Sequence, residues 1–165
     1  MKTLVFFGSL RSIELLKIVI GRDINHLSIY DAKIFNTKLY KVKNENFPYL
    51  KYSDSINDFT QCVYIEKFSK EDFKRIIFYE SIEYKLSKIM ISLNNINKET
   101  YYFELIKKKK TSKPWEFDKW RIKYEKFSCI AASDWMSLFP KYKHIPAEAE
   151  KFWQEMLFKA NEKIN

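Results

Sequence analysis

Two short segments of the sequence carry the residue types that chemistry on a small molecule needs. The first is Phe7-Gly8-Ser9-Leu10, a tight turn directly after the apolar run 4–7. Gly8 is one of two glycines in the chain, so we expect it to serve a backbone need, either a positive φ or a close approach of a ligand. A turn between a strand and a helix also directs successive N–H groups one way, which suits a carboxylate. An ordinary strand-to-helix turn would explain the same residues, and no G-x-S-x-G frames Ser9 as a nucleophile.

The second segment ends in Glu80, which follows Phe73, Ile76 and Ile77 at the spacing i, i+3, i+4, i+7. This spacing predicts one inward stripe of a helix. A carboxylate that faces a core is costly unless it is hydrogen-bonded or used. At the helix C-terminus the backbone dipole also disfavours negative charge, so burial and dipole both raise the pKa toward the range of a general acid/base.

Two alternatives for this segment stay open. The helix could end at Tyr79, in which case Glu80 turns to solvent. Glu83 is a second carboxylate nearby, but it follows the break in periodicity and is predicted to be exposed. Tyrosines surround both carboxylates in the sequence, and spacing does not say which of them supply hydroxyls to a pocket.

The first part of the chain predicts a strand, a helix and then a β-rich region. Residues 2–7 form a short buried strand, and Ser12 caps a helix to about Ile20 that stops at Gly21. Ile13, Leu16 and Ile20 are predicted to share the inward face of this helix. Residues 28–66 alternate aromatic and β-branched residues between turn signals, with the clearest strand over 60–66.

The second part predicts one more helix, two strands and a helical tail. Ser69 and Asp72 resemble a capping box for a helix to about Tyr79, and 84–93 and 100–106 are predicted strands. From residue 114 the sequence holds all four tryptophans and predicts two or three short helices, the last from near Pro146. We therefore expect an α+β fold in a single domain, 1–165, with a core over 1–106 and a helical cap over 107–165 packed on it.

The amino-acid composition indicates which class of protein the chain belongs to. The 165 residues are 46% hydrophobic and 31% charged, as in globular chains. No apolar run is long enough to span a membrane, and the N-terminus lacks the h-region of a signal peptide, so we expect a cytoplasmic protein without membrane contact. The net charge of +9 is spread along the chain, apart from the lysine run 107–110, which predicts a solvated loop. Nucleic acid is therefore an unlikely partner.

Cysteine and histidine give no sign of a metal site. Cys62 and Cys129 lie far apart and are expected to be buried reduced thiols. His26 and His144 have no Cys or His neighbour at the spacing of a ligand set. We expect no metal site.

In this order and at this separation, the motifs resemble those of the gamma-glutamylcyclotransferase-like family. The family's Tyr-Gly-Ser/Thr-Leu turn corresponds to Phe7-Gly8-Ser9-Leu10, and its Tyr-Pro segment to Phe47-Pro48-Tyr49-Leu50. Its Leu-Asp-x-Tyr-Glu block corresponds to Ile76-Ile77-Phe78-Tyr79-Glu80, followed by Tyr84. The resemblance covers about residues 3–106, and the tryptophan-bearing tail is of a kind seen in the family.

The resemblance implies a small mixed β-barrel with flanking helices and a pocket at its mouth. It further implies that a γ-glutamyl amine or amino acid is cyclised to 5-oxoproline with release of the amine, without metal or cofactor. Glu80 would be the general acid/base, while the backbone and side chains of 7–10 and Tyr84 would bind the substrate. The protein would act as a monomer or homodimer, and Trp115, Trp120 and Trp135 are candidates for the pocket rim.

The chain departs from the family pattern at four positions. Phe7 replaces a Tyr, Gln61 replaces a Gly before a strand, and Ile77 replaces the Asp of the Leu-Asp pair. Leu86 also lies where many members carry Arg. These departures predict altered substrate contacts, and a member that binds a ligand or partner without turnover is the alternative to an active enzyme.

Overall fold

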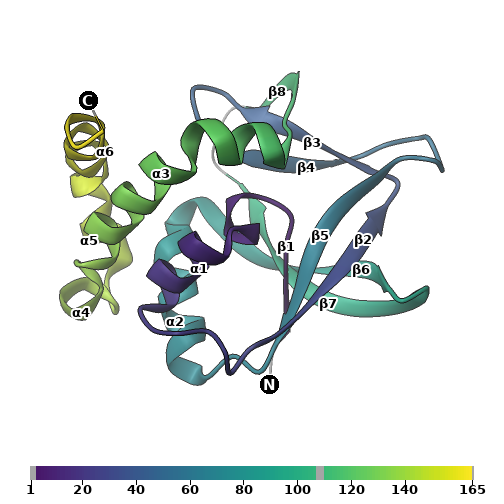
Figure 1. Ribbon diagram of the computed structural model, residues 1–165, viewed down its shortest axis with the longest axis horizontal. Coiled ribbons are helices and arrows are strands. Elements are labelled where there is room, and N and C mark those ends of the chain that lie inside the picture. The colour runs from purple at the N-terminus through teal and green to yellow at the C-terminus, as the bar shows by residue number, and fades with distance from the viewer. Residues whose placement is uncertain (1–2, 107–109, 165) are drawn as a thin grey trace.

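Five strands close into a barrel that forms the right half of the view in Figure 1. The computed structural model describes residues 3–106 and 110–164. The barrel order is β1-β5-β2-β6-β7, and its strands are β1 (Leu4–Phe6), β2 (Ser28–Phe35), β5 (Phe59–Glu66), β6 (Tyr84–Leu93) and β7 (Ile96–Leu105). Because β1 pairs antiparallel with β5 and parallel with β7, the barrel is mixed, as the resemblance implied.

A second sheet of three strands, in the order β4-β3-β8, lies beside the barrel. It contains β3 (Thr37–Val42), β4 (Pro48–Tyr52) and β8 (Lys110–Pro114). Strand β8 corrects the prediction of a purely helical segment over 107–165. Its sequence, Lys-Thr-Ser-Lys-Pro, has no alternation of apolar residues that would predict a strand. It is a strand because it pairs with β3, where Tyr40 lies opposite Pro114 and Val42 opposite Lys110. Of the predicted lysine loop, 107–109 lie outside the described residues.

Helix α1 (Ile13–Ile20) begins and ends where the sequence predicted. The amide of Leu15 donates to Ser12 Oγ at 3.1 Å, and Gly21 closes the helix at φ 76°. Its inward face differs from the prediction, because Ile13 is exposed while Leu15, Leu16, Val19 and Ile20 are buried. A short 3₁₀ helix, η1 (Ser9–Arg11), precedes it.

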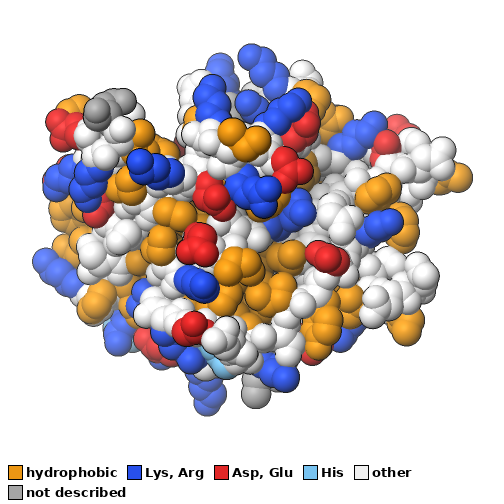
Figure 2. All heavy atoms as spheres, in the orientation of Figure 1, with side chains coloured by type: hydrophobic (Ala, Val, Ile, Leu, Met, Phe, Trp, Pro, Cys, Tyr) orange, Lys and Arg blue, Asp and Glu red, His pale blue; other side chains and the backbone are white. Residues whose placement is uncertain are grey.

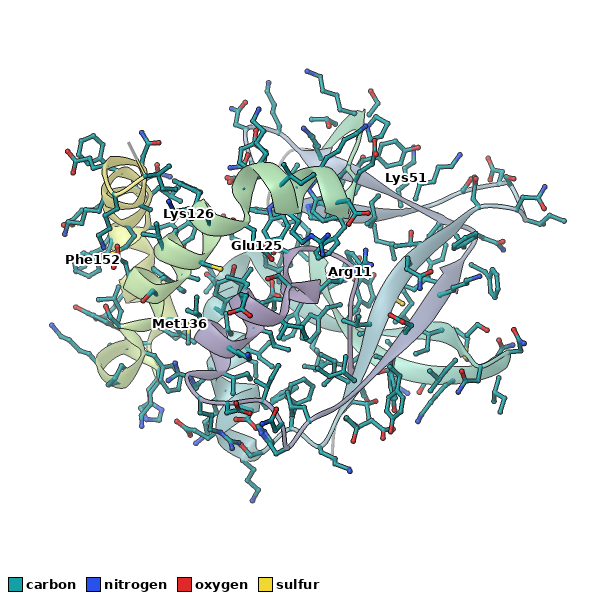
Figure 3. All side chains as sticks on the ribbon, in the orientation of Figure 1. Arg11, Lys51, Glu125, Lys126, Met136 and Phe152 are labelled. Atoms are coloured by element: carbon teal, nitrogen blue, oxygen red, sulfur yellow. The ribbon has the colours of Figure 1, made fainter. Side chains whose placement is uncertain are left out.

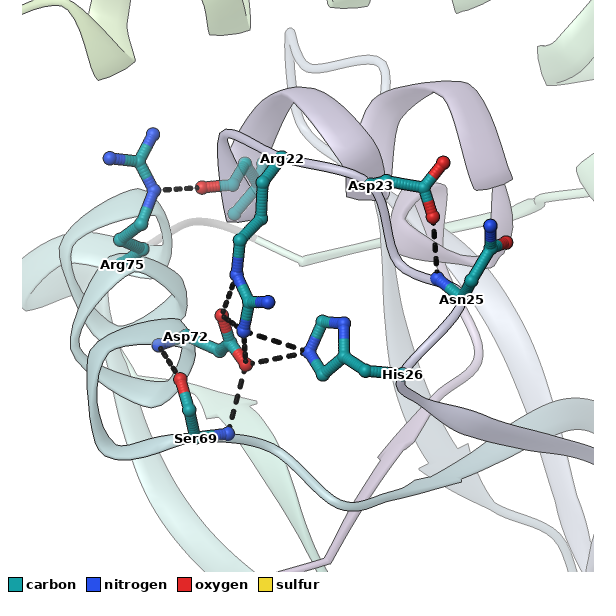
Figure 4. A network of polar contacts seen from close by, with 8 residues as sticks. Arg22, Asp23, Asn25, His26, Ser69, Asp72 and Arg75 are labelled. Atoms are coloured by element: carbon teal, nitrogen blue, oxygen red, sulfur yellow. Dashed lines mark hydrogen bonds and ion pairs between the residues drawn. The ribbon is translucent and has the colours of Figure 1, made fainter.

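Helix α2 (Lys70–Glu80) carries the predicted capping box between Ser69 and Asp72. Asp72 is 1% exposed and also receives Arg22 Nη2 and His26 Nε2, each at 2.9 Å, so it ties α2 to the segment after α1 (Figure 4). The predicted inward stripe is wrong at Ile77, which is 43% exposed. Phe78 is buried instead, because the helix also packs on its other side against Trp135, whose ring is 5.2 Å away.

The C-terminal helices pack beside α1 and α2 rather than on the open faces of the barrel (Figure 1). They are α3 (Phe117–Met136), α4 (Phe139–Tyr142), α5 (Pro146–Ala149) and α6 (Trp153–Glu162), with a 3₁₀ turn over Glu150–Phe152. The first is one helix of 20 residues, not several short ones, because no Gly or Pro interrupts it. Pro146 begins α5, and the last helix begins later, at Trp153.

One buried cluster joins the barrel to the helices. It includes Leu4 and Phe6 of β1, Leu16 of α1, Ile76 of α2 and Trp120 of α3. Within residues 3–106 and 110–164, no helix has the length and apolar character that crossing a bilayer requires. Lys and Arg side chains are scattered over the face in Figure 2, densest over β3, β4 and β8, with Asp and Glu among them.

Candidate active site

A cavity of about 290 Å³ opens between the end of β1, strand β4, the C-terminus of α2 and the β6–β7 hairpin. All six residues that the sequence singled out line it, namely Phe7, Gly8, Ser9, Leu10, Glu80 and Tyr84. Glu80 and the turn at Gly8 are 72 positions apart in the chain, and the fold brings them together at this cavity.

The structure gives Gly8 a backbone need that the sequence did not predict, the close packing of another segment of the chain. Its φ is −101°, so the glycine is not required for a positive φ. An added Cβ would instead lie 3.1 Å from Pro48 Cγ, so the glycine allows the turn to pack against the start of β4. The first hydrogen bond of η1 runs from Arg11 N to Gly8 O at 3.1 Å, so the helix itself offers no acceptor to the amides of Ser9 and Leu10.

Glu80 is the last residue of α2, and its side chain is partly exposed to the cavity. Desolvation by the surrounding protein raises the pKa of its carboxyl to about 8. Among the described residues, none donates a hydrogen bond that would offset this burial. A carboxyl in this condition exchanges protons near neutral pH, as a general acid/base must.

Glu83, the other carboxylate considered, is partly buried rather than exposed. The short 3₁₀ helix η2 (Ser81–Glu83) continues directly from α2 and holds it against the protein. Glu83 lines the smaller of two cavities that reach Glu80, of about 90 Å³, and not the larger one of about 290 Å³ (the large cavity).

Tyr79 and Tyr84 lie close enough to Glu80 to feel its charge, and Tyr102 lines the same cavity as Glu80. Burial, and then the negative charge of Glu80, raise the pKa of Tyr84 well above its ordinary value. Burial likewise raises the pKa of Tyr79, whose hydroxyl lies within hydrogen-bonding reach of the Ser9 side chain. Tyr102 has its pKa raised by burial to about 12, and its ring lies 5.9 Å from that of Phe7. These phenols therefore stay neutral and act as hydrogen-bond donors or acceptors.

Charged residues that the sequence did not point to lie on the other side of the cavity. Lys51 of β4 and Lys110 of β8 line it, and Figure 3 labels Lys51 on the second sheet. Glu104 of β7 also lines it, and its carboxylate pairs with Lys85 at 3.1 Å and accepts a hydrogen bond from the Ser87 hydroxyl at 2.7 Å. Lys51 and Lys110 are 59 positions apart, and they reach one cavity because β4 and β8 pair with the two sides of β3. The predicted solvated loop is therefore wrong at Lys110, which lies in β8.

The predicted tryptophan rim is wrong for this cavity. Trp115 and Trp120 are 5% and 3% exposed and belong to the core cluster around α1 and α3. The guanidinium of Arg11, which Figure 3 labels, lies 4.3 Å from the ring centroid of Phe117. Trp135, together with Trp153, lines a second and smaller cavity that also reaches Glu80.

The residues that differ from the family's motifs lie in different parts of the structure. Phe7 lines the cavity without a hydroxyl, whereas Ile77 faces solvent. Gln61 pairs with Lys33 within the β2–β5 ladder, outside the lining of the large cavity. Cys62 is buried, which raises the pKa of its thiol to about 12, and Cys129 is partly buried; both are free.

No protein-family model matches the chain, and no curated protein matches it. Solved structures do. A solution structure from Arabidopsis thaliana is 17% identical with a TM-score of 0.57, covering 85% of this chain and 80% of that one. A gamma-glutamyl cyclotransferase is 10% identical with a TM-score of 0.53, covering 93% and 98%. An uncharacterized protein from Homo sapiens is also 10% identical, with a TM-score of 0.55 and the same coverage.

The chain therefore has the gamma-glutamyl cyclotransferase fold. This confirms the fold that the sequence resemblance implied: a mixed β-barrel with flanking helices. At identities of 10–17% the likeness concerns the fold alone. The chemistry of the site must be argued from its own residues.

Proposed function

We propose that the chain is a gamma-glutamyl cyclotransferase-like enzyme, in which Glu80 is the general acid/base. The observation that carries the proposal is that the Glu80 carboxyl, with a pKa of about 8, shares one cavity with the turn Gly8–Leu10. The first supplies proton transfer near neutral pH, and the second supplies backbone groups that can orient a substrate.

The reaction is intramolecular in the substrate. Ionised Glu80 accepts a proton from the α-ammonium, and the freed amine attacks the γ-carbonyl carbon. The new N–C bond closes the five-membered ring of 5-oxoproline as the bond from the γ-carbon to the leaving nitrogen breaks. Glu80 returns the proton to that nitrogen, then accepts the second proton of the ring nitrogen and passes it to the released amine. The amine leaves as an ammonium ion and Glu80 is again ionised.

The remaining groups of the cavity hold the substrate for this attack. The amides of the Gly8–Leu10 turn, with Lys51 and Lys110 nearby, are suited to the α-carboxylate of the γ-glutamyl moiety. Tyr84 lies close enough to Glu80 to feel its charge, so its hydroxyl is placed to orient the carboxyl or the γ-carbonyl oxygen. Holding the amine beside the carbonyl lowers the entropic part of the barrier.

The alternative is a protein that binds a γ-glutamyl compound without turning it over. Phe7 favours it, because a phenyl ring stands where the related motif has a tyrosine hydroxyl. A panel of γ-glutamyl amines and amino acids, assayed for 5-oxoproline release by the purified full chain, separates the two. Release from at least one substrate supports the enzyme; saturable binding without release from any of them supports the alternative.

A further inference from the structure

A cavity of about 320 Å³ lies between strand β3, the end of β8 and the first turns of α3 (Figure 1). Among the described residues, none lines both this cavity and the large one, so it is separate from the candidate active site. Its volume falls in the range of small-molecule sites, about 300–1,000 Å³. We call it the β3–α3 cavity.

Two buried tryptophans form part of its wall. Trp115 and Trp120, which the sequence suggested for the rim of the active-site pocket, line this cavity instead, with ring centroids 6.2 Å apart. The indole N–H of Trp115 donates to the Asn46 carbonyl at 3.0 Å, and its amide donates to the Leu39 carbonyl at 3.0 Å. Tyr124, about one turn after Trp120 on α3, adds a partly buried phenol. The aromatic side of the cavity is therefore fixed by hydrogen bonds and packing within the protein.

Three lysines from two elements line the same cavity. Lys41 belongs to β3, and Lys119 and Lys123 lie four residues apart on α3. Lys119 pairs with Glu116 at 2.6 Å, and Glu116 is the one carboxylate among the described residues of the wall. No Asp or Glu in the described part of the chain pairs with Lys41 or Lys123. Two ammonium groups at this cavity therefore lack a counter-charge among the described residues.

This arrangement of charges favours an anion. Lysines four residues apart on one helix repel each other, and Lys41 adds a positive charge from the β3 side. The ammonium group of Lys123 lies 5.1 Å from the ring centroid of Tyr124, so the charge stays beside the aromatic wall. A phosphate monoester carries a charge of about −1.5 to −2 at pH 7, and so matches two lysines better than a single carboxylate does.

We propose that the β3–α3 cavity is a second ligand site, which binds a small phosphate monoester whose organic part carries a ring, such as a nucleoside monophosphate. Lys41 and Lys123 attract the phosphate as point charges. The aromatic wall at Tyr124 and the two tryptophans contacts the organic part, for which the cavity has room beyond a phosphate ion. The site goes beyond the proposed function, because neither Glu80 nor the turn at Gly8 takes part in it.

Isothermal titration calorimetry of the full chain with 5′-AMP, inorganic phosphate and adenosine tests the ligand class. 5′-AMP should bind most tightly, and phosphate and adenosine should each bind at least about tenfold more weakly, since each lacks one half of the ligand. Equal affinity for 5′-AMP and adenosine would overturn the phosphate contact. Equal affinity for 5′-AMP and inorganic phosphate would overturn the organic part, and no binding by any of the three would overturn the site.

Two pairs of variants locate the binding. Lys41→Gln and Lys123→Gln each remove one ammonium group from the wall and should weaken 5′-AMP binding by about tenfold, the usual scale for one charge-assisted contact. Lys113→Gln on β8 and Lys126→Gln on α3, where Figure 3 labels Lys126, remove the same charge from exposed positions outside the lining and should leave the affinity unchanged. Weaker binding in all four variants would point to the overall charge of the protein and against this cavity.

The binding experiments do not require turnover, so a failure of the proposed function leaves them valid. Lys41→Gln and Lys123→Gln leave the lining of the large cavity unchanged and should release 5-oxoproline at the rate of the wild type. Saturating 5′-AMP should not compete with the γ-glutamyl substrate. Competitive inhibition, with an inhibition constant equal to the Kd from calorimetry, would place the nucleotide in the large cavity and overturn the second site.

Discussion

Gly8 packs so closely against Pro48 in the wall of the cavity that a Cβ added to Gly8 would lie 3.1 Å from Pro48 Cγ and 3.2 Å from Pro48 Cδ. The contact joins the turn after β1 to the first residue of β4, and both residues line the cavity. Gly8→Ala should push the two apart, lowering the free energy of unfolding by about 1–3 kcal/mol and reducing kcat/KM. Chemical denaturation and steady-state kinetics measure the two effects.

A double-mutant cycle checks the cause. Pro48→Ala removes the two ring atoms that the new Cβ would meet, so the double variant should lose less stability than the sum of the single variants. Strict additivity would show that the two positions do not interact and that the effect of Gly8→Ala lies elsewhere.

The pKa of Glu80 sets the pH dependence of the proposed reaction. Because its carboxyl is protonated below a pKa of about 8, the base form is scarce at pH 6. We expect kcat/KM to rise roughly tenfold per pH unit below pH 8, as Glu80 ionises in the free enzyme. A profile that is flat between pH 5 and pH 8 would contradict a carboxyl with this pKa as the base.

The same pKa predicts that Glu80 destabilises the fold at neutral pH. The folded protein holds the proton up to about pH 8, whereas the unfolded chain loses it near pH 4.5, so the wild type loses stability as pH rises through this window. Glu80→Gln should therefore equal the wild type at pH 4 and exceed it by about 1–3 kcal/mol at pH 8. Urea denaturation at both pH values measures this difference, and a variant less stable than the wild type at pH 8 would argue against the burial of an uncompensated carboxyl.

Asp72 has the opposite effect on stability. Burial alone would raise its pKa, but hydrogen bonds from the Ser69 backbone, His26, the Ser69 side chain and Arg22 lower it to about 2. Its stabilisation is thus present above pH 3.8 and lost as the pH falls toward 2. Asp72→Asn should cost about 1–3 kcal/mol at pH 7 and clearly less at pH 2, as measured by denaturant unfolding. A cost that does not change with pH would show that the charge of Asp72 is not involved.

Local signals in the sequence predicted what is local in the structure. Ser12 and Gly21 mark the ends of α1, and Ser69 with Asp72 begins α2, because caps act within one turn of a helix. Glu80 was placed by periodicity instead, and α2 ends at Glu80, one residue beyond the predicted end near Tyr79. The turn at Gly8 was placed correctly. Its glycine is needed because the turn packs against Pro48, and not because its φ is positive.

The rest depends on contacts between distant segments. Strand β8 exists through its pairing with β3, and its own residues give no strand signal. Lys51 and Lys110 come to one cavity through that sheet, so neither could be chosen from the sequence. Helix periodicity misplaced Ile77 because it assumes one buried face, whereas α2 packs on two sides, with Ile76 in the core cluster and Phe78 against Trp135.

The central claim is that Glu80 transfers the proton in a cyclotransferase reaction. The most direct measurement is kcat/KM for 5-oxoproline release by the wild type and by Glu80→Gln, which keeps the shape of the side chain but cannot exchange the proton. Glu83→Gln, which changes a carboxylate outside the large cavity, is the control for an altered charge nearby. The proposal predicts a loss of at least about a hundredfold in Glu80→Gln and a much smaller change in Glu83→Gln. Turnover by Glu80→Gln at the rate of the wild type would contradict it.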